Sequence, residues 1–263
     1  MSELFQQAVA NTLPLLQSIE GGVKSTPKAS LAALKKLQAA AKAASPAPLM
    51  TSEENNGTPW TWSALEKAIL SCQKCQNLVA SRTQVVFGVG NRDAELMFIG
   101  EAPGADEDKL GEPFVGRAGQ LLTKIIEAMG FTRDDIFIAN VLKCRPDMPA
   151  GESGNRKPRM DEMTTCLPWL REQIQLVKPR VMVALGATAA EGLLGETRPM
   201  RELRGQWLDF HSTPVMVTYH PAYLLRNQTI TEKRKVWEDM LLVLEKLGHP
   251  ISEKQRRFFT SAA

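Results

Sequence analysis

Several kinds of segment are missing from this sequence, and each absence narrows what the protein can be. No apolar run approaches the roughly 18 residues that a membrane-spanning helix needs, so we expect no membrane partner. The N-terminus, MSELFQQAVANTLPLLQ, has an early glutamate and no basic region before its apolar residues, which argues against a secretory signal. Arginine is absent from the first 81 residues, which argues against an organelle transit peptide. We therefore expect a cytoplasmic protein.

The overall composition is that of an ordinary globular protein. Hydrophobic residues make up 43% of the 263 residues, and charged residues make up 23%. The formal net charge of +3 is compatible with a polyanionic partner but does not identify one. Evidence for such a partner must come from local features of the chain.

Composition divides the chain into three parts. Residues 1–58 contain two helical patterns, of which the second, KASLAALKKLQAAAKAA, is rich in alanine and lysine and has few large apolar groups. SPAP and TSEENNGTP follow, and they are typical of a break and a polar linker. We predict a partly helical N-terminal extension over 1–58, one α/β domain over 59–250 and a C-terminal tail over 251–263.

Strand and helix patterns alternate from residue 59 onward. Short apolar runs predict strands, and apolar residues at helical spacing predict helices. The predicted strands are 95–100, 135–143, 180–186, 206–210 and 214–220, and the predicted helices are 60–72, 116–130, 160–177, 187–195 and 233–248. The last two strands resemble the arms of a hairpin. The alternation predicts right-handed crossovers and a mostly parallel sheet that is covered on both faces.

Polar residues follow three of these strands. Glu101 and His220 come at or just after the end of a predicted strand, and Asn140 follows the apolar run 135–139 within another. Any one of them alone could be a capping or loop residue. Because ligands bind beyond the carboxyl ends of the strands in such sheets, their convergence on one edge favours a functional site.

The first of these strand ends is the turn GEAPG (100–104). Its two glycines allow close backbone approach and its proline fixes the turn, so it can hold Glu101 rigidly and leave backbone N–H groups available. We expect Gly100, Ala102 and Gly104 to contact the substrate. The turn lacks both the GxGxxG of a dinucleotide site and the GK[ST] of a P-loop, which argues against a nucleotide-cofactor enzyme.

The four cysteines predict a metal site. A CxxC pair is followed by a third cysteine after 68 residues and a fourth after 21 more. In a chain without an export signal, four thiols favour a metal over disulfides. Thiolates suit both zinc and an iron–sulfur cluster, and the spacing does not choose between them. All four positions are filled, which favours a structural role. The predicted ligands are Cys72, Cys75, Cys144 and Cys166.

Two segments are candidates for contact with nucleic acid. The basic segment, residues 145–165, is rich in proline, glycine, arginine and lysine, although an ordinary solvated loop has the same composition. HPAYLLRNQ (220–228) begins with a rigid proline turn and continues with apolar residues that could form a wedge in a base stack or simply pack inside the domain. The candidates are Arg145, Arg156, Lys157 and Arg159 in the first segment, and Tyr223, Leu224 and Arg226 in the second.

With these motifs in view, the sequence resembles the family 4 uracil-DNA glycosylases from about Trp60 to Leu247. The resemblance rests on CQKCQNLVASRTQVVFGVGN, LMFIGEAPGADEDKLGEPFVGRAGQLL, FIANVLKCRP, the late Cys166 and HPAYLL. It implies an α/β/α sandwich around a four-stranded, mainly parallel sheet. It also implies a structural [4Fe–4S] cluster on the four cysteines, and a monofunctional enzyme of base excision repair that hydrolyses the bond between uracil and deoxyribose.

The resemblance also implies roles for individual residues. Phe114 corresponds to the aromatic ring that stacks on a flipped base, Asn140 to the amide that reads uracil, and His220 to the second-motif histidine that stabilises the departing base. Glu101 and Glu107 correspond to the acidic residues of the first motif. Which of the two orients water stays open, and Glu107 is also a candidate for excluding the methyl group of thymine.

Two departures from the family affect these expectations. The basic segment is longer than the family pattern, with DMPAGESG resembling an insertion, which puts its conformation in doubt. A relative that crosslinks covalently to uracil-DNA has GEQPG and a histidine in its basic loop. Here the motif is GEAPG and the segment contains no histidine, so we predict turnover without a trapped adduct. Family 5 enzymes lack the glutamate of the first motif and fit less well.

Other functions remain as alternatives. They are excision of another damaged base such as hypoxanthine or xanthine, a non-catalytic DNA-binding protein on the same fold, and a zinc-stapled nucleotide enzyme. We expect a monomer that acts on single- or double-stranded uracil-containing DNA and associates with the nucleoid. Binding of a protein partner by residues 1–58 is a further hypothesis.

Overall fold

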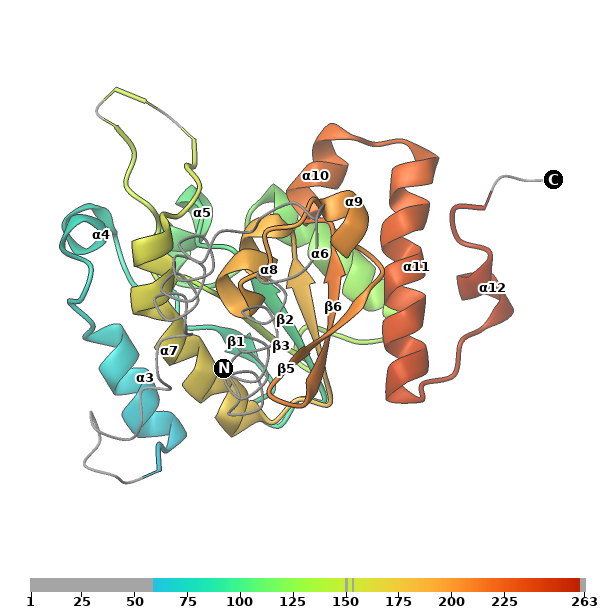
Figure 1. Cartoon of the computed structure of the whole chain (residues 1–263), viewed down its shortest axis with the longest axis horizontal. Coiled ribbons are helices and arrows are strands. Elements are labelled where there is room, and N and C mark those ends of the chain that lie inside the picture. The colour runs from blue at the N-terminus through green and yellow to red at the C-terminus, as the bar shows by residue number, and fades with distance from the viewer. Residues whose placement is uncertain (1–58, 150, 153, 261–263) are drawn as a thin grey trace, which may run out of the picture. The chain divides into compact units, whose positions relative to one another are not determined.

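A computed structural model describes residues 59–149, 151–152 and 154–260. The prediction of a partly helical extension over 1–58 lies outside these residues. The described chain forms a six-stranded sheet in the order β1–β3–β2–β4–β6–β5, with helices on either side (Figure 1). The strands are β1 (Val89–Gly90), β2 (Leu96–Gly100), β3 (Phe137–Asn140), β4 (Val181–Leu185), β5 (Trp207–Phe210) and β6 (Thr213–Thr218).

The four central strands are parallel, and the two edge strands are antiparallel. β3, β2, β4 and β6 pair in parallel, with Gly100 opposite Asn140 and Ile99 opposite Ala184. β1 pairs antiparallel with β3, and β5 forms the predicted hairpin with β6. The α/β class and the mainly parallel sheet are confirmed, and the sheet gains one short antiparallel strand at each edge beyond the four strands that the resemblance implied.

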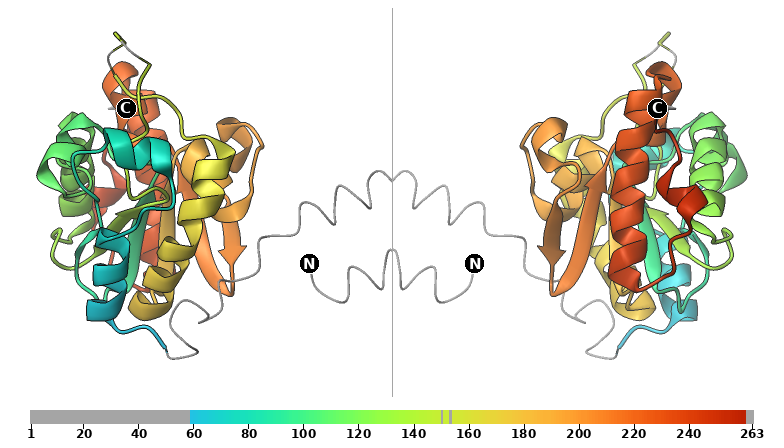
Figure 2. Two further views of the ribbon diagram at one scale, coloured as in Figure 1. Left: turned by 90° about the vertical axis from the view of Figure 1, so that its left-hand side faces the viewer. Right: turned by 90° about the vertical axis from the view of Figure 1, so that its right-hand side faces the viewer.

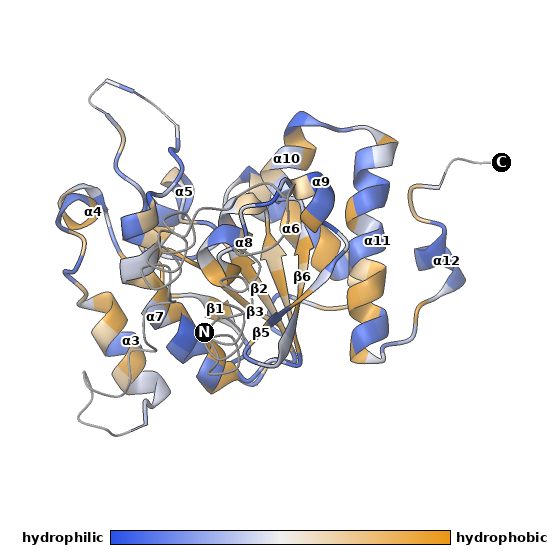
Figure 3. Cartoon of the chain, viewed as in Figure 1, coloured by the Kyte–Doolittle hydropathy of each residue, from blue (hydrophilic) through white to orange (hydrophobic). Residues whose placement is uncertain are grey.

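Each face of the sheet is covered by helices with an apolar side (Figure 2 and Figure 3). Alternate residues of a strand point to opposite faces, so each face has its own core. On one face, α3 (Trp62–Leu70), α7 (Met160–Val177) and α8 (Ala187–Leu194) pack over a core that includes Met97 and Ile99. On the other face, α6 (Arg117–Met129) and α11 (Ile230–Leu247) pack over a core that includes Leu96 and Phe98. The result is an α/β/α sandwich.

Short helices fill the connections between these elements. They are α4 (Gln76–Ser81), α5 (Ala105–Leu110), α9 (Met200–Leu203), α10 (Pro221–Arg226) and α12 (Glu253–Arg256). The segment with α12 packs on the domain, since Trp237 Nε1 donates to Gln255 O at 2.6 Å and the Trp237 ring lies 5.2 Å from that of Phe258. Within the described part of the chain, no helix is both long and apolar enough to cross a membrane.

Candidate active site

The carboxyl ends of the parallel strands bring the three predicted strand-end residues to one edge of the sheet. Glu101 directly follows β2, Asn140 is the last residue of β3, and His220 comes two residues after β6. Gly100 of β2 pairs with Asn140, and Gly186, which follows β4, lies against His220. In sheets of this type, this edge holds the ligand.

Asn140 supplies a buried amide whose oxygen is unsatisfied. The residue is 2% exposed, and its Oδ1 atom has no hydrogen-bond partner among the described residues. A Cβ atom at position 100 would collide with this oxygen and with the ring of Phe114, so glycine is needed for the amide and the ring to lie side by side. Buried polar atoms are nearly always paired in native proteins. The unpaired oxygen therefore points to a ligand that donates a hydrogen bond to it.

Phe114 places an aromatic ring beside this amide in a strained backbone conformation. Its φ angle of +54° lies in the left-handed region, which bulky side chains seldom occupy. The residue is buried, and its ring stacks on that of His220 with the centroids 5.6 Å apart. Backbone strain of this kind persists only where the surroundings enforce it, and it concentrates at functional sites.

His220 is a neutral imidazole that presents an N–H group to the site. Its Nδ1 atom accepts a hydrogen bond from the backbone N–H of Ala222 at 3.1 Å, at the start of α10. Burial lowers the pKa of His220 from 6.5 to about 4, and the positive charge of Arg226 adds to this effect. The ring is therefore neutral near pH 7. Because Nδ1 is an acceptor, the proton is on Nε2, which can donate to a ligand.

The carboxylate of Glu107 is occupied by backbone donors. Its Oε2 accepts from the N–H of Gly104 at 3.0 Å, and its Oε1 accepts from the N–H groups of Val115 and Gly116 at 3.0 Å each. These bonds tie the start of α5 to the start of α6. They hold the residues that directly follow Phe114.

The carboxyl group of Glu101 lies next to the first turn of α8. It hydrogen bonds with Thr188, and the charges of Lys157 and Glu191 act on it. Burial raises the pKa of Glu101, while the Thr188 hydrogen bond and Lys157 partly offset that effect. The sequence analysis did not identify Thr188, although it lies just after a predicted strand, at the same edge as the other site residues.

Charged residues of the basic segment pair mainly within the segment, and Lys157 links it to α8. Arg156 forms an ion pair with Glu162 at 2.6 Å and also pairs with Asp147, so its guanidinium group is occupied inside the segment. Lys157 pairs with Glu191 of α8 at 2.5 Å, and its side chain is 58% exposed. Arg145 donates to the carbonyl of Gly154 at 2.7 Å. Lys157 is thus the more accessible cation.

The residues of HPAYLL lie partly inside the domain. Leu224 is 4% exposed and belongs to the interior, so a wedge role would require it to move. Tyr223 stacks on Tyr219 with the ring centroids 4.4 Å apart, and its hydroxyl donates to Glu232 at 3.1 Å. Arg226 is exposed at the end of α10.

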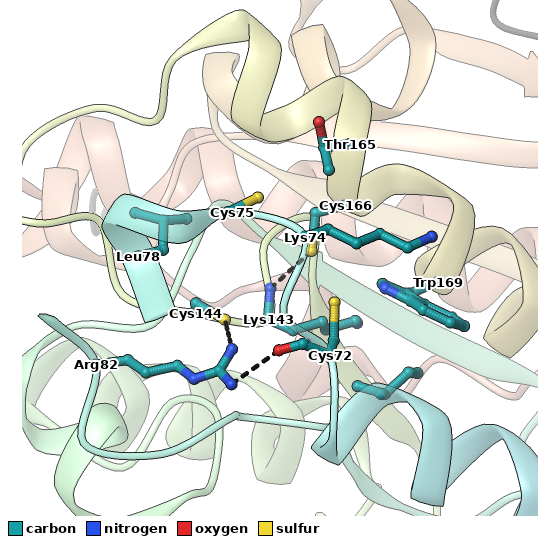
Figure 4. Close-up of a pocket in the computed structure, with 11 residues that line it drawn as sticks. Cys72, Lys74, Cys75, Leu78, Arg82, Lys143, Cys144, Thr165, Cys166 and Trp169 are labelled. Carbon is teal, nitrogen blue, oxygen red and sulfur yellow. Dashed lines mark hydrogen bonds between the residues drawn. The ribbon is translucent and has the colours of Figure 1, made fainter. Parts of the chain in front are cut away.

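The four cysteines line one cavity on the α3/α7 side of the sheet (Figure 4). They come from three separate places: Cys72 and Cys75 flank the turn between α3 and α4, Cys144 follows β3, and Cys166 is in α7. All four are free thiols. Burial raises the pKa of Cys166 to about 12, and it also raises the pKa of Cys144 and Cys75.

The donor set around this cavity suits a group that carries negative charge. Arg82 Nη1 donates to Cys144 Sγ at 3.0 Å, Arg82 Nη2 donates to Cys72 O at 2.8 Å, and the Lys143 N–H donates to Cys166 Sγ at 3.2 Å. Over the described ranges, no three His, Cys, Asp or Glu side chains converge closely enough to hold a single metal ion. Thiols that share a cavity without meeting at one point fit a polynuclear cluster better than a single zinc ion, whose sulfur ligands lie about 2.3 Å from the metal.

Lys143 connects the cysteine cavity with Asn140, and the sequence analysis did not identify it. The side chain is fully buried, and its Nζ atom donates to Asn140 O at 2.9 Å and to Gln173 Oε1 at 2.5 Å. Burial lowers the pKa of Lys143 to about 8, and the adjacent thiols act in the opposite direction. The signal in the sequence that could have identified it is a lysine directly before Cys144 and after two apolar residues.

Comparisons with known proteins give a family match over this domain. The family model described as "Uracil DNA glycosylase superfamily" matches residues 87–241. A type-4 uracil-DNA glycosylase of Thermotoga maritima is 42% identical over 178 residues, which cover 67% of this chain and 89% of that protein. A type-4 uracil-DNA glycosylase of Archaeoglobus fulgidus is 37% identical over 201 residues, which cover 73% of this chain and 94% of that protein.

A type-5 protein is less similar. The type-5 uracil-DNA glycosylase of Pyrobaculum aerophilum is 28% identical over 189 residues, which cover 59% of this chain and 80% of that protein. The higher identity to the type-4 proteins agrees with the glutamate in GEAPG, which the sequence analysis took as the mark of that group.

Proposed function

The chain belongs to the uracil-DNA glycosylase superfamily, within its type-4 group, and on that basis we propose that it excises uracil from DNA. It is a monofunctional DNA glycosylase that hydrolyses the N-glycosyl bond between the base and deoxyribose and leaves an abasic site for repair. The observation that carries the proposal is the buried, unpaired Oδ1 of Asn140, next to an aromatic ring and a neutral histidine.

Base recognition would begin with extrusion of the uracil into the pocket at the sheet edge. Leaving the duplex stack costs a few kcal/mol, and stacking on Phe114 would return on the order of 1–3 kcal/mol. The amide of Asn140 accepts from N3–H and donates to O4 of uracil. Cytosine presents the opposite pattern at these atoms and would leave the buried amide unpaired, which is how a hydrogen-bonding site rejects a near-isostere.

Bond breaking would develop negative charge on the leaving uracil, chiefly near O2. The Nε2–H group of His220 would donate to that oxygen, and backbone N–H groups of the GEAPG turn would add to the effect. The low pKa of His220, which burial produces, means that the neutral ring is the form that donates near pH 7.

The two carboxyl groups would have different roles. Glu107 accepts three backbone hydrogen bonds, which supports a role in fixing the loop that carries Phe114 and, with it, the side of the pocket that excludes the thymine methyl group. Glu101 is then the candidate for stabilising the cation-like sugar or orienting the attacking water. Its contact with Thr188 would set the direction of its carboxyl group.

A [4Fe–4S] cluster would be held by Cys72, Cys75, Cys144 and Cys166. The shared cavity and the donors from Arg82 and Lys143 suit a negatively charged, thiolate-bound group, and the similarity to type-4 proteins favours a cluster over a single zinc ion. When bound, it supplies a covalent tie between the segment after α3, the end of β3 and α7. The reaction is assigned to the residues at the sheet edge.

DNA would be held by cations around that edge. Lys157 and Arg226 are exposed near Glu101 and His220 respectively, and both suit phosphate contacts. Arg145 and Tyr223 are secondary candidates. Arg156 would act mainly by holding the basic segment in shape, and Leu224 would fill the gap in the base stack only after leaving the interior.

The test is incubation of the purified full-length chain with a labelled oligonucleotide that contains one uracil, followed by alkali and a denaturing gel. We expect a strand break at the uracil and none at thymine in a matched oligonucleotide. An intact uracil strand with folded, brown protein would remove the proposal. A break at hypoxanthine would widen the substrate range, and a denaturant-resistant protein–DNA band would contradict the predicted turnover.

A further inference from the structure

Arg133 contacts the backbone of Phe114 from a distant part of the chain. It lies in the connection between α6 and β3, where its side chain is half-buried. Its Nη2 atom donates to Pro113 O at 2.9 Å, and its Nη1 atom donates to Phe114 O at 3.2 Å and to Thr123 Oγ1 at 3.3 Å. All three acceptors are neutral oxygens. One guanidinium group thus holds two consecutive carbonyl groups and the side chain of a residue in α6.

The geometry of these contacts requires an arginine. In an extended strand consecutive carbonyl groups point to opposite sides, whereas the carbonyls on either side of the left-handed Phe114 backbone, with its φ of +54°, both reach one guanidinium group. A guanidinium group offers several N–H donors in a fixed plane and can serve both carbonyls at once, whereas an ammonium group is a single point. Burial lowers the pKa of Arg133, and the negative charges of Glu112 and Asp134 partly offset that effect.

A glycine on α6 completes the enclosure of this bend. A Cβ atom at position 119 would overlap the carbonyl group of Phe114, so the helix backbone lies directly against the bend. Thr123, which accepts from Arg133, also donates to the carbonyl of Gly119 at 3.1 Å. The strained residue is therefore held by a helix on one side and by Arg133 on another.

We propose that Arg133 is a positioning residue that holds Phe114 in its left-handed conformation, so that the ring faces the base pocket. This inference rests on the proposed function, in which Phe114 stacks on the flipped base. Without the two carbonyl contacts, the backbone at Phe114 would relax toward negative φ, and the ring would leave its place beside the amide of Asn140. The effect on the reaction would be transmitted through Phe114 alone.

A double-mutant cycle tests this relation. Single-turnover rates of uracil excision are measured for the wild type, Arg133→Lys, Phe114→Ala and the double variant. We expect Arg133→Lys to slow excision on the order of tenfold, the effect of losing about 1.4 kcal/mol in charged hydrogen bonds, and to have no further effect once Phe114 is alanine. The control is Arg180→Lys, because Arg180 pairs with Glu95 at the opposite end of β4. We expect that variant to keep the wild-type rate.

The outcomes separate this inference from the proposed function. If Phe114→Ala is slow and Arg133→Lys slows both backgrounds equally, Arg133 does not act through Phe114, and the inference fails while the proposed function stands. If Phe114→Ala excises at the wild-type rate, the stacking role and the inference both fail. An unchanged rate in Arg133→Lys would also overturn the inference.

Folding of the variants is checked by thermal melting. If Arg133→Lys does not fold, Thr123→Val removes the third acceptor, together with the hydrogen bond from that hydroxyl to Gly119, and keeps the shape of the side chain. A smaller loss of rate in that variant, again absent in the Phe114→Ala background, would support the inference. An equal loss in both backgrounds would overturn it.

Discussion

At the residue scale, Asn140 combines near-complete burial with a side-chain oxygen that accepts no hydrogen bond within the described part of the chain. Replacing it by alanine removes the groups that read the base but breaks no hydrogen bond of that oxygen. We expect Asn140→Ala to lower kcat/KM for uracil excision by roughly a hundredfold or more, with the melting temperature almost unchanged. The measurement is steady-state excision beside thermal melting. Near-normal turnover in Asn140→Ala would exclude the base-reading role.

The protonation of His220 makes a prediction about pH. Its folded pKa of about 4 lies below the ordinary 6.5, so between these values the unfolded chain binds the proton and the folded chain does not. The stability that this neutral ring contributes is fully present above about 6.5 and is lost as pH falls toward 4. Activity that depends on the neutral ring should likewise persist below pH 6.5.

The pH–rate profile checks this directly. We expect kcat/KM of the wild type to show no acid limb near pH 6.5 that depends on His220. Comparison with His220→Gln identifies the contribution of the ring, and the difference in melting temperature between the two proteins should shrink as pH falls from 6.5 to 4. An acid limb near 6.5 that disappears in His220→Gln would mean that the ring titrates normally.

At the element scale, Glu107 joins two helices through the backbone. It accepts from Gly104 at the start of α5 and from Val115 and Gly116 at the start of α6. Glutamine at this position keeps one acceptor oxygen but replaces the other with an N–H₂ group, which faces a backbone donor. We expect Glu107→Gln to cost about 1–3 kcal/mol of stability and to slow excision, because the loop after Phe114 loosens.

The control for this variant is Asp106→Asn, a neighbouring carboxylate on the same short helix that is exposed. Thermal melting and single-turnover excision are measured for both variants. If Glu107→Gln melts like the wild type while excision is lost, the carboxylate acts in the chemistry and its backbone contacts are secondary. Equal losses of stability and excision rate in both variants would show that the negative charge on α5 causes the effect, and not the three backbone contacts of Glu107.

Elements with a clear apolar pattern could be predicted from the sequence, and the short helices in the connections could not. Helix α7 spans the predicted 160–177 because its apolar spacing persists over its whole length. Strand β3 ends at Asn140, before the predicted 143, because two consecutive N–H groups, of Val141 and Leu142, bond to the β2 side, which breaks the alternation of a strand. Helix α10 is too short to show a period, although a histidine cap followed by proline is a start signal.

Some residues of the site could likewise be predicted from the sequence, and others could not. Glu101, Asn140 and His220 could be placed at one edge because the order of strands and helices alone determines where strand ends lie. Arg133 and Lys143 could not be assigned, because their partners depend on how loops fold back after the sheet forms. The carbonyls that Arg133 holds are 19 and 20 residues away, and the glutamine that accepts from Lys143 is 30 residues away.

At the scale of the whole molecule, the cysteine cavity and the base pocket lie on different sides of one strand end. Cys144 and Cys166 belong to the core on the α3/α7 face, and Cys72 and Cys75 pack against it. Phe114 belongs to the core on the other face. Lys143 bridges the two regions through the carbonyl of Asn140. Loss of the cysteine ligands should therefore loosen one face first and disturb the pocket only through this bridge.

Cys166→Ser tests this arrangement. Since the four ligands tie three separate segments together, we expect the variant to lose its iron and its brown colour, and to melt on the order of 10 °C lower, as a loss of about 3–5 kcal/mol implies for a domain of this size. Thr165→Ser is the control, because Thr165 lines the same cavity without a thiol. Trypsin should cut the folded variant first after Lys74 and Arg82, which flank α4. Full iron content and an unchanged melting temperature in Cys166→Ser would contradict the proposal that the four cysteines bind the cluster and thereby stabilise the fold.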